Sequence, residues 1–144
     1  MTKNAICLNV TNNIQQVSYA ISSARTLCND IDVVCLLIGN IDDSVVRLCK
    51  ELGAEIIDVN QLFEDTFTWF KEKNCQTCVH PGTKVKYSKY VFGRFLIPFV
   101  DKLKQYDKVL YMDTDCIVLK PLDELFNTQM DKYSMIVYDG QDIK

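Results

Sequence analysis

The first 60 residues combine short continuous apolar runs with longer segments in which apolar residues recur every three or four positions. The short runs are typical of strands buried on both faces, and the longer segments are typical of amphipathic helices. The predicted strands are residues 5–10, 32–38 and 54–59, and the predicted helices between them are residues 11–28 and 42–52. Strands that alternate with helices favour right-handed crossovers and a parallel sheet.

The ends of these helices are marked by residues that cap or stop helices. Asn12 or Asn13 is expected to cap the first helix, and Asp42 or Asp43 the second. Gly53 is expected to stop the second helix, because glycine readily adopts the left-handed conformation that follows a helix end.

A third helical pattern covers residues 87–105, with Val91, Phe95 and Phe99 on one face. Pro98 is expected to kink or divide this helix, because proline lacks the amide hydrogen that a helix interior uses. The remaining expected elements are a fourth strand at 108–112, an extended stretch at 116–120, a short helical turn at 121–126 and a last strand at 133–139.

Composition favours one globular domain over the 144 residues, 1–144, since 48% are apolar and 24% charged. The net charge of −3 gives no electrostatic reason to expect a nucleic-acid partner. No run approaches the ~18 apolar residues of a membrane span, and the first residues lack the apolar core of a signal peptide. A cytoplasmic location is therefore expected. The seven cysteines are expected to be reduced, with Cys7, Cys35, Cys49 and Cys116 acting as small apolar residues.

Two carboxylates, Asp113 and Asp115, directly follow the fourth apolar run. In extended backbone, side chains two residues apart leave on the same side. Like charges this close repel unless a cation lies between them, and carboxylate oxygens suit Mg²⁺ or Mn²⁺. Ligands of open parallel sheets bind beyond the carboxyl ends of the strands. The pattern predicts a metal–diphosphate site; a solvated turn is the alternative, since aspartate is common in turns.

The surroundings of these carboxylates, residues 92–126, resemble the centre of the family 8 glycosyltransferases, a group that includes glycogenin and bacterial lipopolysaccharide galactosyl- and glucosyltransferases. The shared order is a basic residue on a helix, an apolar strand, Asp-x-Asp, a further strand and an aspartate-leucine turn. The opening, "ICLNVTNN", is similar to the family's nucleotide-binding start. The resemblance implies a GT-A (Rossmann-like) α/β fold and retaining transfer of a hexose from a UDP-sugar, with Mn²⁺ (or Mg²⁺) as cofactor. The acceptor would be a carbohydrate, a glycan or a protein.

The resemblance also assigns roles to residues. It implies that Asp113 and Asp115 bind the metal, with Asp113 and Thr114 near the ribose. It implies that Arg94 contacts the donor and that Asp139 binds hydroxyls of the donor sugar. The residues implied to hold the nucleotide at the end of the first strand are Asn9, Thr11, Asn12 and Asn13.

One part of the family pattern has no match. The family continues with an asparagine-glycine segment and a histidine that gives the metal its third protein ligand, whereas His80 lies upstream of the carboxylates. Weak metal and donor binding and impaired transfer are therefore expected of these 144 residues, as a fragment, a short relative or a degenerate one. A core face left exposed would favour a homo-oligomer.

Other readings stay open beside this one. A nucleotide-sugar-binding remnant would bind donor without turnover. "LYMDTDCIV" is also similar to the opening of haloacid dehalogenase-like phosphohydrolases, although their later motifs need a longer chain after it. The less regular segment 60–86 holds Cys75, Cys78 and His80, which favour an incidental loop pair because a structural zinc site needs four ligands.

Overall fold

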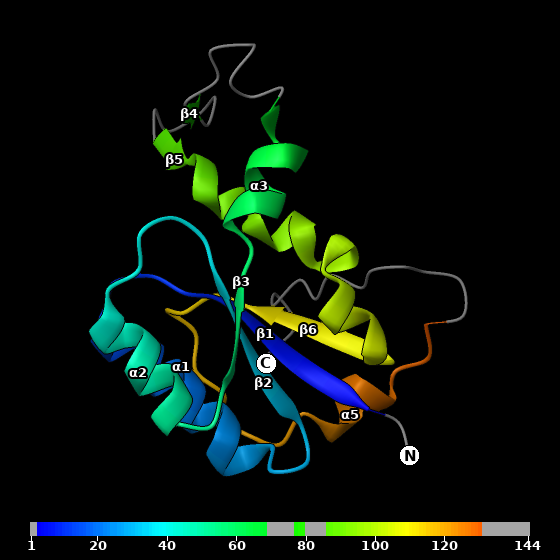
Figure 1. Ribbon diagram of the computed structural model, residues 1–144. Helices are drawn as coiled ribbons and strands as arrows, with labels where there is room; N and C mark the ends of the chain where they lie inside the picture. Colours follow the sequence, from blue (N-terminus) through cyan, green and yellow to red (C-terminus); the bar gives the residue numbers. More distant parts are fainter. Residues whose placement is uncertain (1–2, 69–76, 80–85, 131–144) are drawn as a thin grey trace.

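A four-stranded parallel sheet forms the centre of the computed structural model, which describes residues 3–68, 77–79 and 86–130 (Figure 1). Its strands run in the order β3-β2-β1-β6, and every neighbouring pair is parallel. The strand bounds are β1 Asn4–Asn9, β2 Asp32–Leu37, β3 Glu55–Asp58 and β6 Lys108–Met112. All four strands predicted for this part of the chain are confirmed.

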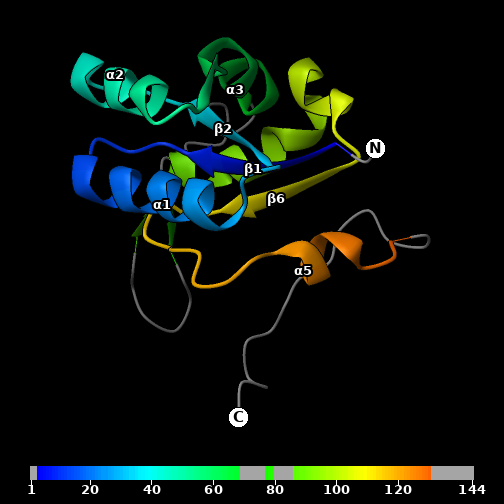
Figure 2. The ribbon, with the colours of Figure 1, turned by 90° about the horizontal axis from the view of Figure 1, so that it is seen from below.

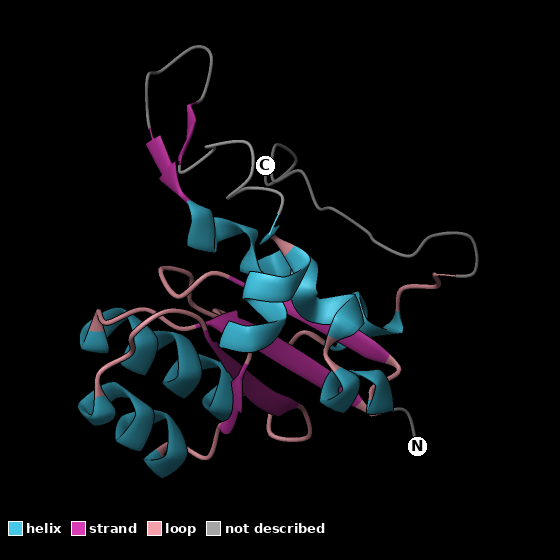
Figure 3. Ribbon diagram, turned by 45° about the horizontal axis from the view of Figure 1, so that its top comes forward, coloured by secondary structure: helices cyan, strands magenta, loops and turns pink. Residues whose placement is uncertain are grey.

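Helices flank this sheet on both sides (Figure 3). The α-helices are α1 Ile14–Leu27, α2 Asp43–Glu51, α3 Asn60–Thr66 and α5 Asp123–Asn127. Two 3₁₀ helices, η1 Lys89–Phe99 and η2 Asp101–Gln105, precede β6, and the short strands β4 Thr77–Val79 and β5 Lys86–Ser88 form an antiparallel pair. Figure 2 shows α5 below the sheet, on the side away from α3.

Two apolar cores lie on the two faces of the sheet, and β1 contributes to both. Ile6 and Leu8 belong to the core with α1 and α2, whereas Ala5 and Cys7 belong to the core with α3, η1 and η2. Successive residues of a strand point to opposite faces, so a strand covered on both sides must be apolar throughout. Each fully buried isoleucine or leucine contributes about 1.5–3 kcal/mol to folding.

The helical stretch before β6 differs from the prediction in type and in buried face. A 3₁₀ helix has three residues per turn, and the buried residues Val100, Leu103 and Tyr106 follow that spacing. Phe95 and Phe99, predicted to lie on one apolar face of a helix, are 54% and 58% exposed. The expected division is confirmed: the two 3₁₀ segments separate directly after the turn that contains the proline.

The helix ends agree in part with the predicted caps. Asn13 caps α1, because the Gln16 amide donates to Asn13 Oδ1 over 3.2 Å. Asp42 occupies the cap position of α2 without a side-chain cap hydrogen bond. Gly53 follows α2 with φ +75°, as expected for the residue after a helix end.

One helix was not predicted, and some predictions concern residues outside the described part of the chain. Helix α3 was not predicted, because only Phe63 of its seven residues is buried and so no apolar face is readable. Asp139 and the strand expected at 133–139 lie outside the described residues, as do Cys75 and His80. The five cysteines described with their side chains are all free thiols.

Candidate functional site

The direction of the chain reverses across β1, and this places two loops side by side. From β1 the chain moves outward through β2 to β3, and then returns to place β6 on the other side of β1. Leu8 pairs with Met112 near the ends of these strands. The loop after β1 and the carboxylates after β6 therefore leave the same edge of the sheet at the point where strand order reverses, which is where ligands bind in open α/β sheets.

A cleft of about 600 Å³ lies at this edge. Its walls come from the ends of β1, β2 and β6 and from η1. The residues that line it are Asn9, Val10, Thr11, Gln16, Ile38, Gly39, Asn40, Ile41, Val91, Arg94, Tyr111, Asp113, Thr114 and Asp115. A volume of this size lies within the range of ordinary small-molecule sites.

Two side chains of the cleft contact the Asp113 carboxylate. The hydroxyl of Tyr111 donates to Asp113 Oδ1 over 2.7 Å, and Arg94 Nη2 lies 3.5 Å from the same oxygen. Burial first, and then the Asp113 carboxylate, raise the pKa of Tyr111 above its ordinary value. The phenol is therefore a stable hydrogen-bond donor at neutral pH.

Arg94 reaches the cleft from η1. Its Nε donates to the carbonyl oxygen of Val91 over 3.1 Å, and its Cζ lies 4.9 Å from the ring centroid of Tyr111. The side chain is 41% exposed, so its charge is available to a ligand in the cleft. An arginine in this position suits an anion with several oxygens, such as a phosphate.

A tight turn follows Asp113. The amide of Cys116 donates to the Asp113 carbonyl over 3.1 Å, which buries Thr114 and leaves Asp115 exposed. Cys116 is also exposed, so its prediction as a buried apolar residue is wrong. Burial, and then the charges of Asp115 and Asp113, raise the pKa of its thiol, which is therefore a weak nucleophile at neutral pH.

The segment after this turn, predicted to be extended, joins no sheet within the described part of the chain. Ser23 of α1 holds it instead: the Val118 amide donates to Ser23 Oγ over 3.0 Å, and Ser23 Oγ donates to the Ala20 carbonyl. Val118 is buried in the core beside α1. The turn that carries the two carboxylates is thus fixed at both ends, by β6 and by α1.

The four residues predicted to hold the nucleotide divide into two pairs. Asn9 and Thr11 line the cleft, whereas Asn12 and Asn13 are not among its lining residues. The side chain of Asn12 connects two loops: its Nδ2 donates to the Asn40 carbonyl over 3.0 Å, and its Oδ1 accepts from the Asp42 amide over 2.8 Å. Asn12 therefore shapes the rim of the cleft.

Replacing Asn12 with alanine will loosen this rim. Each lost hydrogen bond contributes about 0.5–1.5 kcal/mol, and the Asp42 amide will lose its acceptor. We expect faster hydrogen exchange at the Asp42 amide, measured by NMR. Asn12→Asp keeps an acceptor oxygen and should keep the protection, and Asn13→Ala, which removes only the cap of α1, should also leave it intact. Equal exchange in Asn12→Ala and the wild type would contradict this role.

The sequence did not reveal every residue of the cleft. The sequence pattern places Tyr111 only within an apolar strand, and it marks the loop at 38–41 only as the end of a strand. Gly39, at φ +79°, turns this loop, and its amide donates to Asn60 Oδ1 over 2.7 Å. Since β2 is the direct neighbour of β1, the ends of both strands meet at this edge, and that adjacency was the available signal.

The carboxylates fit a hard divalent cation as a pair. Asp113 and Asp115 both line the cleft and both are accessible, and their oxygens are the donors that Mg²⁺ and Mn²⁺ prefer. Within the described residues, no group of three or more histidine, cysteine, aspartate or glutamate side chains is arranged to hold a metal. A cation held by this pair would keep most of its coordination positions for other oxygens, such as those of a phosphate, as is common for Mg²⁺.

Comparison with known protein families shows which family the chain belongs to. The family model described as glycosyl transferase family 8 matches residues 6–144. The chain belongs to glycosyl transferase family 8. This membership favours the glycosyltransferase resemblance over the phosphohydrolase alternative, and no curated protein matches the chain.

Solved structures agree on the fold of this family 8 chain. A structure of an active-site mutant of LgtC is 17% identical to this chain, with a TM-score of 0.59. The match covers 89% of this chain and 43% of the LgtC chain. The galactosyltransferase LgtC in complex with donor and acceptor sugar analogs is 21% identical, with a TM-score of 0.55. The match covers 88% of this chain and 43% of the LgtC chain. GlyE of Streptococcus pneumoniae is 21% identical, with a TM-score of 0.53. The match covers 90% of this chain and 28% of the GlyE chain. The expected GT-A fold is confirmed, and the chain spans less than half the length of each of these proteins.

Among the described helices, none has the length and apolar character needed to cross a bilayer.

Proposed function

We propose that this family 8 chain binds a UDP-sugar together with Mn²⁺ or Mg²⁺ and is the donor-binding part of a retaining hexosyltransferase. One observation carries the proposal: Arg94, Asp113 and Asp115 meet Asn9 and Thr11 around a single cleft at the point where strand order reverses. Two carboxylates for a cation and a guanidinium for phosphate oxygens are the groups that a nucleoside diphosphate requires.

The similar structures support this donor class. One of them is the galactosyltransferase LgtC with donor and acceptor sugar analogs bound. The carboxylate pair and Arg94 lie at the carboxyl edge of a parallel sheet, where nucleotide ligands bind in open α/β proteins. We propose that the diphosphate lies beside Asp113 and Asp115, with the nucleoside toward Asn9, Thr11 and the loop at 38–41.

The residues in the cleft suit the chemistry of sugar transfer. Breaking the bond between the sugar and the diphosphate develops negative charge on the leaving oxygen, and a bound cation would neutralise part of it as a Lewis acid. The partly exposed guanidinium of Arg94 can donate charge-assisted hydrogen bonds to the same phosphate. Tyr111 and Asp113 hold Arg94 over the cleft and so orient it before the donor arrives. The proposed contact between Asp139 and the donor sugar stays a prediction.

Metal removal tests the proposal. Isothermal titration of UDP into the chain should show binding with Mn²⁺ and a large loss of affinity after chelation with EDTA. Residual binding through Arg94 and the nucleoside contacts should persist weakly, because these contacts need no metal. Identical binding with Mn²⁺ and with EDTA, or no binding in either condition, would overturn the proposal; titration of ADP is the control for base preference.

A second candidate is a donor-binding chain that does not catalyse transfer. It is favoured by one observation: the described residues include no third acidic, histidine or cysteine side chain arranged with the carboxylate pair to hold a metal. Incubation with UDP-hexoses, followed by NMR of released sugar, separates the two candidates. Release with retained anomeric configuration supports the transferase, and Mn²⁺-dependent UDP binding without release supports the second candidate.

A further inference from the structure

We propose that Tyr111 is a positioning residue that holds the Asp113 carboxylate and the Arg94 guanidinium in the arrangement that a cation and a diphosphate can enter. This inference rests on the proposed function, because it concerns the same cleft. Tyr111 contacts both groups at once: its hydroxyl donates to Asp113 Oδ1 over 2.7 Å, and its ring lies under Arg94 Cζ at 4.9 Å.

The place of Tyr111 in the fold makes it a rigid support. It is the penultimate residue of β6 and pairs with Cys7 of the central strand β1. The side chain is partly buried, so its ring has little freedom to move. Asp113 lies just beyond the strand, in the turn closed by the Cys116 amide, and Arg94 comes from η1. Of the three side chains, that of Tyr111 is therefore the one that belongs to a strand of the sheet.

The geometry indicates what would happen without the hydroxyl. An arginine beside a carboxylate tends to form two parallel hydrogen bonds that occupy both oxygens. Here Arg94 Nη2 reaches only Asp113 Oδ1, at 3.5 Å, and shares that oxygen with the much shorter bond from Tyr111. Asp113 Oδ2 takes part in neither of these two contacts. Tyr111 thus keeps the ion pair loose and leaves one oxygen for a cation.

The chain provides a matched control at another place in the fold. The hydroxyl of Tyr106 donates to Asp32 Oδ2 over 2.9 Å, and Lys3 Nζ lies 4.7 Å from the centroid of the Tyr106 ring. This is the same combination of a tyrosine, a carboxylate and a cation over the ring. Tyr106 precedes β6 and Asp32 begins β2, so the group lies at the amino ends of the strands, and none of its members lines the cleft.

The experiment compares Tyr111→Phe with Tyr106→Phe in the whole chain. The probe is Mn²⁺ alone, with free Mn²⁺ quantified by electron paramagnetic resonance. We expect Tyr111→Phe to weaken Mn²⁺ binding by about 10–100-fold, the range typical when a hydrogen-bond partner of a metal ligand is removed. Tyr106→Phe should bind Mn²⁺ like the wild type. Urea unfolding should show similar shifts of the midpoint in both variants, which separates positioning from general stability.

A second variant extends the test to the guanidinium. Tyr111→Phe keeps the ring under Arg94, whereas Tyr111→Leu removes it. We therefore expect Tyr111→Leu to weaken UDP binding in the presence of EDTA, where only Arg94 and the nucleoside contacts act, by more than Tyr111→Phe does.

The outcomes separate this inference from the proposed function. If the wild type binds Mn²⁺ and Tyr111→Phe binds it equally well, or if Tyr106→Phe weakens it as much, the positioning role is overturned and the metal site stands. If the wild type binds no Mn²⁺, the proposed metal site fails and the positioning role fails with it.

Discussion

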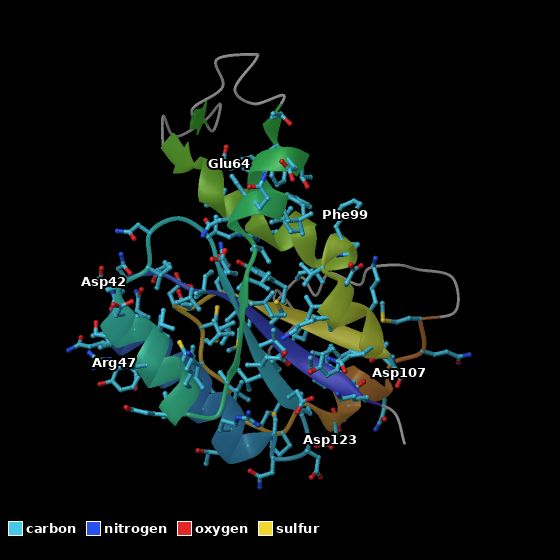
Figure 4. The ribbon with its side chains drawn as sticks, viewed as in Figure 1. Asp42, Arg47, Glu64, Phe99, Asp107 and Asp123 are labelled. Carbon is cyan, nitrogen blue, oxygen red and sulfur yellow. The ribbon has the colours of Figure 1, made fainter. Side chains whose placement is uncertain are left out.

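Replacing either Asp113 or Asp115 with asparagine will remove Mn²⁺-dependent binding of UDP. Asparagine keeps the size of the side chain but loses the charge that a divalent cation requires. We expect a loss of affinity for Mn²⁺ beyond the roughly 10–100-fold that follows removal of a metal ligand's hydrogen-bond partner. Titration calorimetry of UDP with Mn²⁺ measures it. Asp123→Asn is the control, since Asp123 is exposed on α5, away from the cleft rim near Asp42 (Figure 4).

The two variants should differ in stability. Asp113 accepts a hydrogen bond from Tyr111 and pairs with Arg94, so Asp113→Asn gives up a charge-assisted contact and should lower the free energy of unfolding. Asp115 has a weak contact with the Cys116 thiol at 3.8 Å, and its charge repels that of Asp113. Asp115→Asn should therefore unfold at the same urea concentration as the wild type or higher. Retained Mn²⁺-dependent binding in both variants would contradict the assignment.

Gly93→Ala will destabilise the fold and distort the cleft. A Cβ at this position would lie 2.3 Å from Ile38 Cδ1 and 3.0 Å from Asn9 Nδ2, and both residues line the cleft. Ile38 is 4% exposed, so its terminal methyl has little space to move into. Overpacking typically costs about 1–3 kcal/mol, which exceeds the gain of about 1 kcal/mol when alanine replaces glycine in a helix. Urea unfolding measures the loss.

A double variant checks the cause. Ile38→Val removes the methyl group that the new Cβ would meet, at a cost of about 0.5–1.5 kcal/mol by itself. Ile38→Val/Gly93→Ala should therefore lose less stability than the sum of the two single variants, because residues in contact do not act additively. An additive result, or a Gly93→Ala variant as stable as the wild type, would contradict the steric explanation.

The parts of the fold that could be predicted are those with a strong and unambiguous apolar pattern. Strands β1, β2, β3 and β6 are continuous apolar runs because both faces of the sheet are covered. The stretch before β6 was placed correctly but given the wrong period. Three and 3.6 residues per turn differ little over two turns, so the pattern groups Phe95 and Phe99 on one face, whereas Leu96, which lies between them in the sequence, is buried.

The candidate site was predicted where a motif places charged groups at a strand end, and missed where tertiary contacts decide. Asp113 and Asp115 follow an apolar strand, and Arg94 follows from the family pattern; all three line the cleft. Asn12 could not be separated from Thr11 by sequence, because either side chain suits a ligand. Only the fold shows that the Asn12 amide is used by the neighbouring loop.

The pairing of β1 with β6 has a consequence for how the protein folds. These strands lie far apart in the sequence: beside them, Lys3 and Asp107 bond to each other although they are 104 residues apart. Closing so long a loop costs more entropy than forming the local β1-α1-β2 unit, so this contact belongs to the late stage of folding. The cleft needs the ends of both strands. During synthesis, the first strand and its helix emerge long before the carboxylates do, and the cleft does not exist until nearly the whole described chain has left the ribosome.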